Sequence, residues 1–417
     1  MKFFHTADIH FGVENYGKID PATGIHTRLL DFAKNLDVLV DRAIAENIDF
    51  VIFSGDAYKT ANPTPTQQKM LAQRFLRLHQ VGIPIIIIVG NHDHPLSFGK
   101  ANSLDVFSYL PVNGFYVFSR PAMHVIQTKS GPVQIIGVPW PTRNHVVTLQ
   151  AHHHKSNTEI AAYLSESVGN IITQLVSSLD PAIPAVLGGH LTVSSGIFSG
   201  SEKCAVYGTD AVFLPSQLAL PPIDYVALGH LHRFQDLNLG GIPVVYSGSI
   251  ERVDFGERKE DKGFVSVEIT TAPDGLKKTT YAFHVLATRR MIQLDIKLEP
   301  LKDQTEQILT ALEEHVLDDA IVKIIYHLSL GAQDRVDLSV VLRACQKAMY
   351  VVGIIPVHQI APRERRAALK IDMDFTTLLN RYFETKNISV EEKAALMDKA
   401  FMLQHELDTK ATEQEPT

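Results

Sequence analysis

Residues 83–93 read Ile-Pro-Ile-Ile-Ile-Ile-Val-Gly-Asn-His-Asp, so an apolar run stops abruptly at a glycine followed by three polar residues. A short apolar run bounded in this way is typical of a strand buried inside a parallel or mixed sheet. In open α/β sheets, ligands bind beyond the carboxyl ends of the strands. The stretch therefore predicts a buried strand that leads into a functional crevice, with Asn91, His92 and Asp93 at the strand end.

The same arrangement recurs at four other predicted strands, which cover residues 2–7, 49–54, 184–187 and 224–228. They run into Asp8-Ile9-His10, Gly55-Asp56, Gly189-His190 and Gly229-His230-Leu231-His232. A spacing of two residues places Asp8 and His10, or His230 and His232, on one side of an extended segment. A glycine lets the backbone turn tightly beside an ion. A lone Asp-x-His or Gly-His is more often structural, and Gly-Asn-His-Asp alone is structural or functional with equal chance, but the five in order predict one ligand cluster.

The ligand types indicate the chemistry of this cluster. Imidazole, carboxylate and amide oxygens without a thiolate suit Mn²⁺, Fe²⁺ or Zn²⁺. Seven candidate ligands are too many for one ion and fit two ions that share a carboxylate; they are Asp8, His10, Asp56, Asn91, His190, His230 and His232. Such a pair of ions activates water and neutralises charge on a phosphoryl group. The sequence therefore predicts a two-metal phosphoester hydrolase.

The remaining patterns predict an α/β domain of central mixed sheets flanked by helices, followed by two smaller parts. Helices are expected at 27–46, 66–80 and 157–178, further strands at 133–138 and 243–246, and a hairpin at 263–269 and 279–285. After residue 288 we expect strands at 291–297, 320–328 and 351–358, helices at 302–315 and 336–349, and final helices at 373–385 and 390–408. We therefore predict a catalytic domain over 1–287, a small α+β cap over 288–360, and a basic linker with C-terminal helices over 361–417.

Composition limits the alternatives. The chain has 417 residues, a net charge of −7, and only two cysteines, which lie far apart in sequence. No apolar stretch is long enough to span a bilayer, and no signal-peptide core follows Met1, so we expect a cytoplasmic protein without a membrane partner. The negative net charge exerts no general pull on nucleic acid, so any polyanion must be held by a local patch or by metal ions.

The ordered ligand set resembles the calcineurin-like metallophosphoesterase superfamily over residues 1–285. Two segments narrow the resemblance, namely His5-Thr6-Ala7-Asp8-Ile9-His10-Phe11-Gly12 and Gly248 to Glu257 with its continuation Lys262-Gly263-Phe264. Both are similar to the SbcD family, the nuclease subunits of SbcCD complexes, which are bacterial relatives of archaeal and eukaryotic double-strand-break repair nucleases. With the cap and the C-terminal helices, the resemblance spans nearly the whole chain.

The resemblance implies two Mn²⁺ ions and a role for each site residue. One ion would be held by Asp8, His10 and His232, the other by Asn91, His190 and His230, and Asp56 would bridge them. His92 would face the scissile phosphate, where it stabilises the transition state or protonates the leaving oxygen, and Asp93 would accept the second N–H of His92. An alternative for His92 is a hydrogen bond that merely supports the ligands.

The resemblance further implies a DNA nuclease of repair, recombination and replication, with 3'-5' double-strand exonuclease and single-strand and hairpin endonuclease activity. Its partner would be an SbcC-type ATPase docked on the C-terminal helices, since this chain lacks a Gly-x-x-x-x-Gly-Lys-Ser/Thr loop. Those helices could instead pack on the cap. Two rival functions stay open, a small-molecule phosphodiesterase or phosphatase of the same superfamily and a non-catalytic DNA-end-binding scaffold.

Several basic residues are candidate contacts for DNA or a partner, with solvent exposure or surface ion pairs as the alternative: Lys59, Arg252, Arg258, Arg363, Arg365 and Arg366. A homodimer is a further expectation of the resemblance. Its candidate surfaces are the predicted helices at 66–80 and 101–110, which serve equally well as core helices.

Overall fold

The computed structural model describes residues 1–95, 100–110, 112–142, 156–200, 210–358, 375–384 and 388–412. The strands of the catalytic part are β1 (Lys2–Thr6), β2 (Phe50–Phe53), β3 (Ile85–Ile88), β4 (Phe115–Phe118), β5 (Ala122–Thr128), β6 (Gly131–Val138), β7 (Ala185–His190), β8 (Thr192–Val193), β9 (Val212–Phe213), β10 (Tyr225–Gly229), β11 (Gln235–Asp236), β12 (Val244–Tyr246), β13 (Gly263–Thr271) and β14 (Lys277–Val285). Its helices are α1 (Thr27–Ala45), α2 (Pro65–Gln80), α4 (Asn157–Ser177) and α5 (Pro215–Leu218), with 3₁₀ turns η1 (Asp105–Tyr109) and η4 (Phe255–Glu257).

Two six-stranded mixed sheets form the centre of the catalytic part. The first has the order β14-β13-β1-β2-β3-β4, and the second has the order β11-β12-β10-β7-β6-β5. Strands β1, β2 and β3 run parallel, with Phe4 opposite Val51 and Val51 opposite Ile85. Strands β7 and β10 also run parallel, and Gly229 lies opposite His190. The carboxyl ends of these five strands therefore lie at one edge of each sheet.

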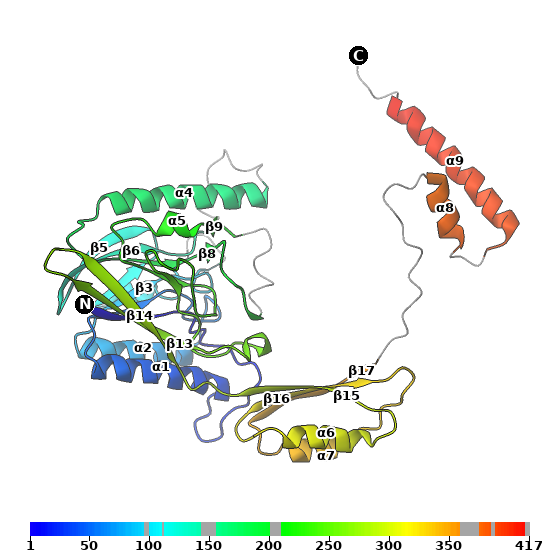
Figure 1. Cartoon of the computed structure of the whole chain (residues 1–417), viewed down its shortest axis with the longest axis horizontal. Coiled ribbons are helices and arrows are strands. Elements are labelled where there is room, and N and C mark those ends of the chain that lie inside the picture. The colour runs from blue at the N-terminus through cyan, green and yellow to red at the C-terminus, as the bar shows by residue number, and fades with distance from the viewer. Residues whose placement is uncertain are drawn as a thin grey trace. The chain divides into compact units, whose positions relative to one another are not determined.

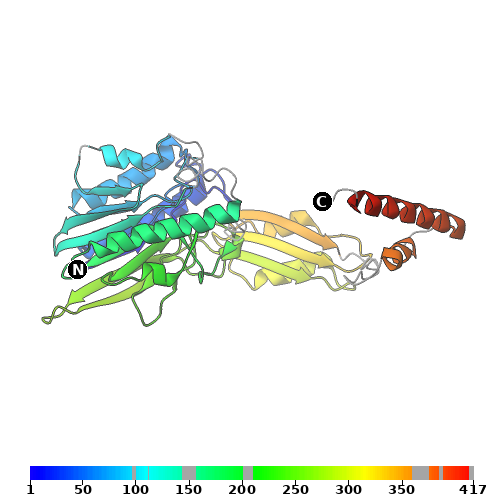
Figure 2. The same ribbon diagram turned by 90° about the horizontal axis from the view of Figure 1, so that it is seen from above.

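The two sheets pack face to face, and each has helices on its outer face (Figures 1 and 2). The layer between the sheets contains Phe3 and Ile52 from the first sheet and Ile135 and Val186 from the second. Helices α1 and α2 cover the first sheet, and helices α4 and α5 cover the second. Burial of apolar side chains in these three layers is the main favourable contribution to folding. The predicted layered α/β fold with mixed sheets and flanking helices is confirmed.

Local sequence signals explain where the helices begin. Thr64 caps α2 and accepts a hydrogen bond from the Gln67 amide, while the Gln67 side chain accepts one from the Thr64 amide. Ser156 and Glu159 form the same reciprocal cap on α4. Such a capping box satisfies two amides that have no partner within the helix.

The α+β part consists of β15 (Met291–Lys297), α6 (Gln304–Glu313), β16 (Ile321–Leu328), α7 (Leu338–Ala344) and β17 (Tyr350–His358), and its sheet order is β15-β16-β17. Contacts join its sheet to the catalytic part in one compact unit, Met1–Tyr326 with Arg335–Pro356. Phe255 packs with Met291, Ile321 and Met349, and Arg289 donates two hydrogen bonds to Asp31 at 2.7 and 2.6 Å.

The second unit is His327–Asp334 with Val357–Thr417. It contains α8 (Phe375–Glu384) and α9 (Val390–Thr412), and the rings of Phe375 and Phe401 lie 6.1 Å apart. The boundaries expected at residues 287 and 360 stay predictions. The basic residues Arg363, Arg365 and Arg366 lie outside the described residues.

The structure contradicts the sequence prediction at two helices. The helix expected at 101–110 is only the 3₁₀ turn η1, because Asp105 and Asn102 direct their side chains to nearby backbone amides. The helix expected at 336–349 ends at Ala344, because the chain must turn back for the Met349 amide to bond the Ala320 carbonyl. Strands β4 and β5 were not predicted. No helix within the described ranges is long and apolar enough to cross a membrane.

Candidate metal centre

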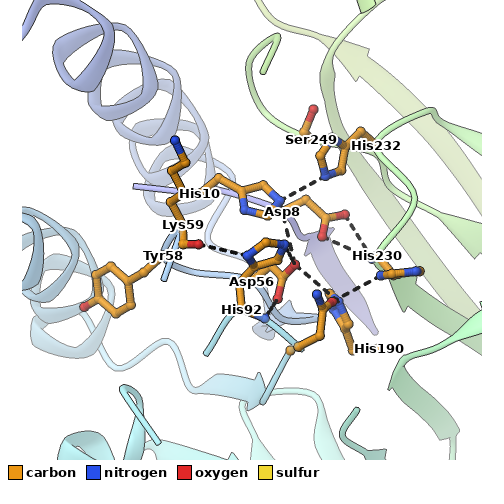
Figure 3. Close-up of polar contacts among 12 residues, drawn as sticks. Asp8, His10, Asp56, Tyr58, Lys59, His92, His190, His230, His232 and Ser249 are labelled. Carbon is orange, nitrogen blue, oxygen red and sulfur yellow. Dashed lines mark hydrogen bonds and ion pairs between the residues drawn. The ribbon is translucent and has the colours of Figure 1, made fainter. Parts of the chain in front are cut away.

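The predicted ligands gather at the carboxyl ends of five strands, which belong to both sheets (Figure 3). In the first sheet, Asp8 and His10 follow β1, Asp56 follows β2, and Asn91 follows β3. In the second sheet, His190 is the last residue of β7, and His230 and His232 follow β10. Hydrogen bonds join the two halves, since the His230 amide donates to both carboxylate oxygens of Asp8 at 3.1 Å.

The backbone at these strand ends is bent into unusual conformations. Four ligands have positive φ angles, namely Asp8 at 52°, His10 at 50°, Asp56 at 57° and His230 at 107°. This left-handed region is costly for residues other than glycine, and such strain concentrates at functional sites. A close approach also requires glycine at position 90, where a Cβ atom would lie 2.1 Å from Oδ1 of Asp56.

The first group of ligand atoms surrounds one position between the sheets. Asp8, His10 and His232 each offer a ligand atom, and these atoms all lie within 4.8 Å of one another. Nε2 of His10 lies 2.9 Å from Nε2 of His232 and 3.7 Å from Oδ2 of Asp56. The four side chains are buried. They match the set expected for the first ion.

The second group lies on the other side of Asp56. Oδ1 of Asn91 is 2.8 Å from Nε2 of His190 and 3.2 Å from Nδ1 of His230. Nε2 of His190 is 3.5 Å from Oδ2 of Asp56. The same carboxylate oxygen thus faces both groups, which is the arrangement that a bridging ligand requires.

Hydrogen bonds outside the cluster fix which ring nitrogen faces it. Nδ1 of His190 donates to the Ser54 carbonyl at 2.7 Å, and Nδ1 of His232 donates to Oε1 of Glu257 at 2.8 Å. In a neutral ring the other nitrogen, Nε2, then carries a lone pair that points into the cluster. Partners of this kind orient the metal-binding histidines of many proteins.

The charges show that the cluster is built for cations. Burial lowers the pKa of His190, but the charge of Asp56 and a hydrogen bond to it more than offset burial and raise the pKa to about 9. Burial raises the pKa of Asp8 to about 7. Burial lowers the pKa of His230 to about 3, and the charge of His190 adds to this effect. Divalent cations would supply the positive charge that the two buried carboxylates demand.

The residues therefore fit two divalent ions. Nδ1 of His190 and Nδ1 of His232 are each held by an acceptor outside the cluster, so in the neutral rings both Nε2 lone pairs are available to a cation. Nitrogen and oxygen ligands in this number suit Mn²⁺, Fe²⁺ or Zn²⁺. The ligand set is that of a metal-dependent phosphoester hydrolase.

His92 differs from the ligands in its exposure. Its side chain is 45% exposed, whereas those of the surrounding imidazoles and carboxylates are nearly inaccessible. Nδ1 of His92 donates to the Lys59 carbonyl at 2.8 Å, and Nε2 lies 3.9 Å from Oδ2 of Asp56 (Figure 3). The ring thus presents Nε2 at the solvent side of the cluster, where a bound ester would lie.

The prediction that Asp93 accepts the second N–H of His92 is wrong. Asp93 is fully buried and accepts from backbone amides, those of Asp56 at 2.9 Å, Gly90 at 3.1 Å and Ala57 at 3.1 Å. Burial and the charge of Asp56 raise the pKa of Asp93 to about 6, although these amides oppose the shift. Asp93 therefore fixes the loops after β2 and β3. Its side chain points toward these amides and away from the ring of His92.

Two further residues contribute to the site and were not predicted to do so. Glu257 holds His232 and also pairs with Nζ of Lys262 at 3.0 Å, and all three side chains are buried. Burial alone would raise the pKa of Glu257, but the charges of His232 and Lys262 lower it to about 2. Trp140 packs its ring 4.8 Å from that of His230. The position of Glu257 within the SbcD-like segment is the sequence feature that could have indicated its role. No motif around Trp140 indicates a part in the cluster.

The other basic candidates occupy different surroundings. The Lys59 side chain is exposed near the cluster. The guanidinium of Arg252 donates to the backbone carbonyls of Arg289 and Glu260, and that of Arg258 donates to the carbonyl of Phe255. Arg252 and Arg258 thus hold the local fold, and Lys59 stays a candidate contact for a polyanion.

A comparison with known protein families agrees with this geometry. Residues 1–234 match the family model described as calcineurin-like phosphoesterase. A dimetal phosphatase from Danio rerio aligns with 11% identity and a TM-score of 0.35, over 64% of this chain and 92% of that chain. A candidate 5'-nucleotidase from Staphylococcus aureus, solved with alpha-ketoglutarate, aligns with 14% identity and a TM-score of 0.38, over 68% of this chain and 53% of that chain. This chain thus spans about half the length of the staphylococcal protein.

Proposed function

The chain belongs to the calcineurin-like phosphoesterase family, and on this basis we propose that it is the nuclease subunit of an SbcCD-type complex, which hydrolyses DNA phosphodiesters with two Mn²⁺ ions. The family and the ligand cluster make the chain a metallophosphoesterase-superfamily hydrolase. The DNA substrate, the choice of Mn²⁺ and the ATPase partner are the proposed parts.

One observation carries the proposal, namely the convergence of seven ligands beneath a single exposed imidazole. Among the described residues around the cluster, the exposed side chain of His92 is placed to meet an incoming ester. When bound, two divalent ions at such a site activate water and neutralise the charge of the phosphoryl group.

The protein's own groups then control the proton and the geometry. Because Nδ1 of His92 keeps its proton in the hydrogen bond to the Lys59 carbonyl, Nε2 is the atom that exchanges a proton with the substrate. In the imidazolium form of the ring, Nε2–H would donate a hydrogen bond to the phosphoryl group or give its proton to the leaving oxygen, which leaves His92 neutral. The His92 amide donates to Oδ1 of Asp56 at 2.9 Å, which leaves Oδ2 turned toward the ligand groups. Asp93 keeps both loops in place through backbone amides.

DNA is favoured as substrate by features outside the ligand set. The SbcD-like segment from Gly248 to Phe264 supplies Glu257 and Lys262, which hold His232 from behind. The chain also continues for about 130 residues beyond the catalytic part, and a small-substrate enzyme does not need them. In α9 the apolar side chains of Leu396 and Leu403 are exposed. Residues at this spacing share one side of a helix, and a helix face of this kind suits docking on a partner helix.

The test is Mn²⁺-dependent cleavage of an end-labelled DNA hairpin, with and without an SbcC-type ATPase and ATP, beside a generic p-nitrophenyl phosphodiester. We expect DNA cleavage that the ATPase and ATP stimulate. Turnover of the small ester alone would replace the proposal with a small-molecule phosphodiesterase. Metal binding without turnover of either substrate would instead indicate a scaffold.

Two variants assign any observed cleavage to this cluster. Asp56→Asn should lose both metal and activity, because it removes the charge of the bridging carboxylate. His315→Ala is a matched control, since His315 is an exposed histidine in the loop after α6. A contaminating nuclease would cleave equally in all three preparations.

A further inference from the structure

A cavity of about 480 Å³ adjoins the metal centre on the side of the second sheet. Its wall includes Trp140, Tyr163 and Arg120, together with apolar side chains such as Leu164 and Val168 of helix α4. The volume lies within the range of about 300–1,000 Å³ that small-molecule sites occupy. A DNA duplex is too large for such a cavity, but one flat aromatic group is not.

Trp140 connects this cavity to the ligand cluster. Its ring packs at 4.8 Å and an interplanar angle of 38° against His230, and it lies 6.0 Å from His190. The same indole lines the cavity. Trp140 therefore contacts both the cavity and His230 of the second ligand group.

The backbone holds this indole in place. The Trp140 amide donates to the Val89 carbonyl at 3.0 Å, directly before Gly90 and Asn91. Pro139 and Pro141 flank Trp140, and proline fixes φ and restricts the residue before it. Because the platform is ordered before binding, little conformational entropy is lost when a planar ligand stacks on it.

We propose that this cavity binds one unpaired nucleobase of the substrate strand, stacked on Trp140, while the adjacent phosphodiester lies over the metal centre. The inference rests on the proposed DNA hydrolysis and adds a base-binding subsite to it. Aromatic side chains stack on every base, so this subsite selects unpaired strands and not a sequence. Arg120 is exposed at the cavity wall, where its charge can meet a neighbouring phosphate.

The sequence itself provides a direct probe, because Trp140 is the only tryptophan in the chain. Tryptophan emission of the full chain therefore reports on this residue alone. We would titrate the metal-free protein in chelator with a single strand of about eight thymidines, a typical site size for such binding. An abasic strand of equal length and a blunt duplex are the comparison ligands.

Two α4 variants form a matched pair for this titration. Ser167→Phe places a ring into the cavity from its wall. Gln174→Phe places the same ring on an exposed position of the same helix, outside the cavity lining. We expect the thymidine strand to quench the emission, with a Kd about tenfold weaker or more in Ser167→Phe and unchanged in Gln174→Phe.

A second measurement does not depend on any variant. A strand carrying 5-bromodeoxyuridine should cross-link to Trp140 or Tyr163 under ultraviolet light. Peptide mass spectrometry would identify the cross-linked residue. Equal quenching by the abasic strand, an unchanged Kd in Ser167→Phe, or cross-links only elsewhere would each overturn the base subsite. Since none of these readouts requires hydrolysis, quenching without DNA cleavage would leave the subsite standing and refute the nuclease proposal.

Discussion

Nδ1 of His232 donates to Oε1 of Glu257 at 2.8 Å, and both side chains are buried within the same polar group as Lys262. This pair links a metal ligand to a residue 25 positions later in the chain. Glu257 thus acts on the metal centre by orienting the imidazole of His232.

We expect Glu257→Gln to weaken Mn²⁺ binding by about 10- to 100-fold, because partners of metal-binding histidines typically have effects of this size. Isothermal titration with Mn²⁺ measures the change. Glu260→Gln is the matched control, since Glu260 also pairs with Lys262, at 3.1 Å, but does not contact His232. Equal losses in both variants would assign the effect to Lys262 and not to the orientation of His232.

His92→Ala should reduce cleavage by about 100- to 10,000-fold, the contribution typical of a positioned acid or base. Its Mn²⁺ content should stay close to that of the wild type, because the seven ligands are other residues. Metal analysis beside a single-turnover assay separates the two effects. Full activity in this variant would rule out His92 as a catalytic group.

Gly90→Ala should disrupt the metal centre although position 90 carries no ligand. The added Cβ would lie 2.1 Å from Oδ1 and 2.4 Å from the amide nitrogen of Asp56, so the two loops must separate. We expect loss of bound Mn²⁺ and a destabilisation of about 1–3 kcal/mol, as for other overpacked interiors. Gly353→Ala, where the nearest atom is 3.4 Å away in Ile355, should change neither quantity.

Acid should destabilise the protein partly through His5. Burial lowers the pKa of His5 to about 3, although a hydrogen bond to the Leu228 carbonyl opposes the shift. The unfolded chain therefore binds more protons than the folded one between this pKa and the ordinary value of about 6.5. The stabilising contribution is complete above about pH 6.5 and is lost as the pH falls toward 3.

His5→Gln removes this titration and keeps a polar group beside Tyr225, whose hydroxyl lies 3.1 Å from Nδ1 of His5. Between neutral pH and about pH 4.5, the free energy of unfolding should fall by about 2–3 kcal/mol more in the wild type than in the variant. Urea unfolding of the metal-free proteins at both pH values gives the difference. If the free energy of unfolding fell equally with pH in the wild type and in His5→Gln, His5 would not be the group that binds a proton on unfolding.

The candidate ligands could be picked out from sequence because each one follows a recognisable local signal, an apolar strand that stops at polar residues and, in most cases, at a glycine. Asn91, His190 and His230 are of this kind. The groups that orient the histidines have no such signal. The carbonyls of Ser54 and Lys59 come from the backbone, which every residue type supplies, and Glu257 reaches His232 only through the tertiary fold.

The error at Asp93 has the same origin. Sequence adjacency favoured a bond to His92, but in the turn after β3 the two neighbouring side chains point in different directions, and Asp93 meets the amides of Asp56 and Ala57. Trp140 could not be predicted as part of the site for a related reason. Its hydrogen bond to Val89 joins the loop after β6 to the end of β3, and this contact exists only once the two sheets have packed.

Because Asp8, Asp56 and Asn91 come from one sheet and His190, His230 and His232 from the other, an ion held by either group would cross-link the two sheets of the sandwich. By mass action, free Mn²⁺ at a hundredfold excess over its Kd would add about 2.7 kcal/mol per site to the free energy of unfolding. The sheets could then separate only after the ions dissociate, so amide hydrogen exchange at the ends of β1, β3 and β10 should slow together on metal loading. Metal supply would in this way set the lifetime of the folded protein as well as its activity.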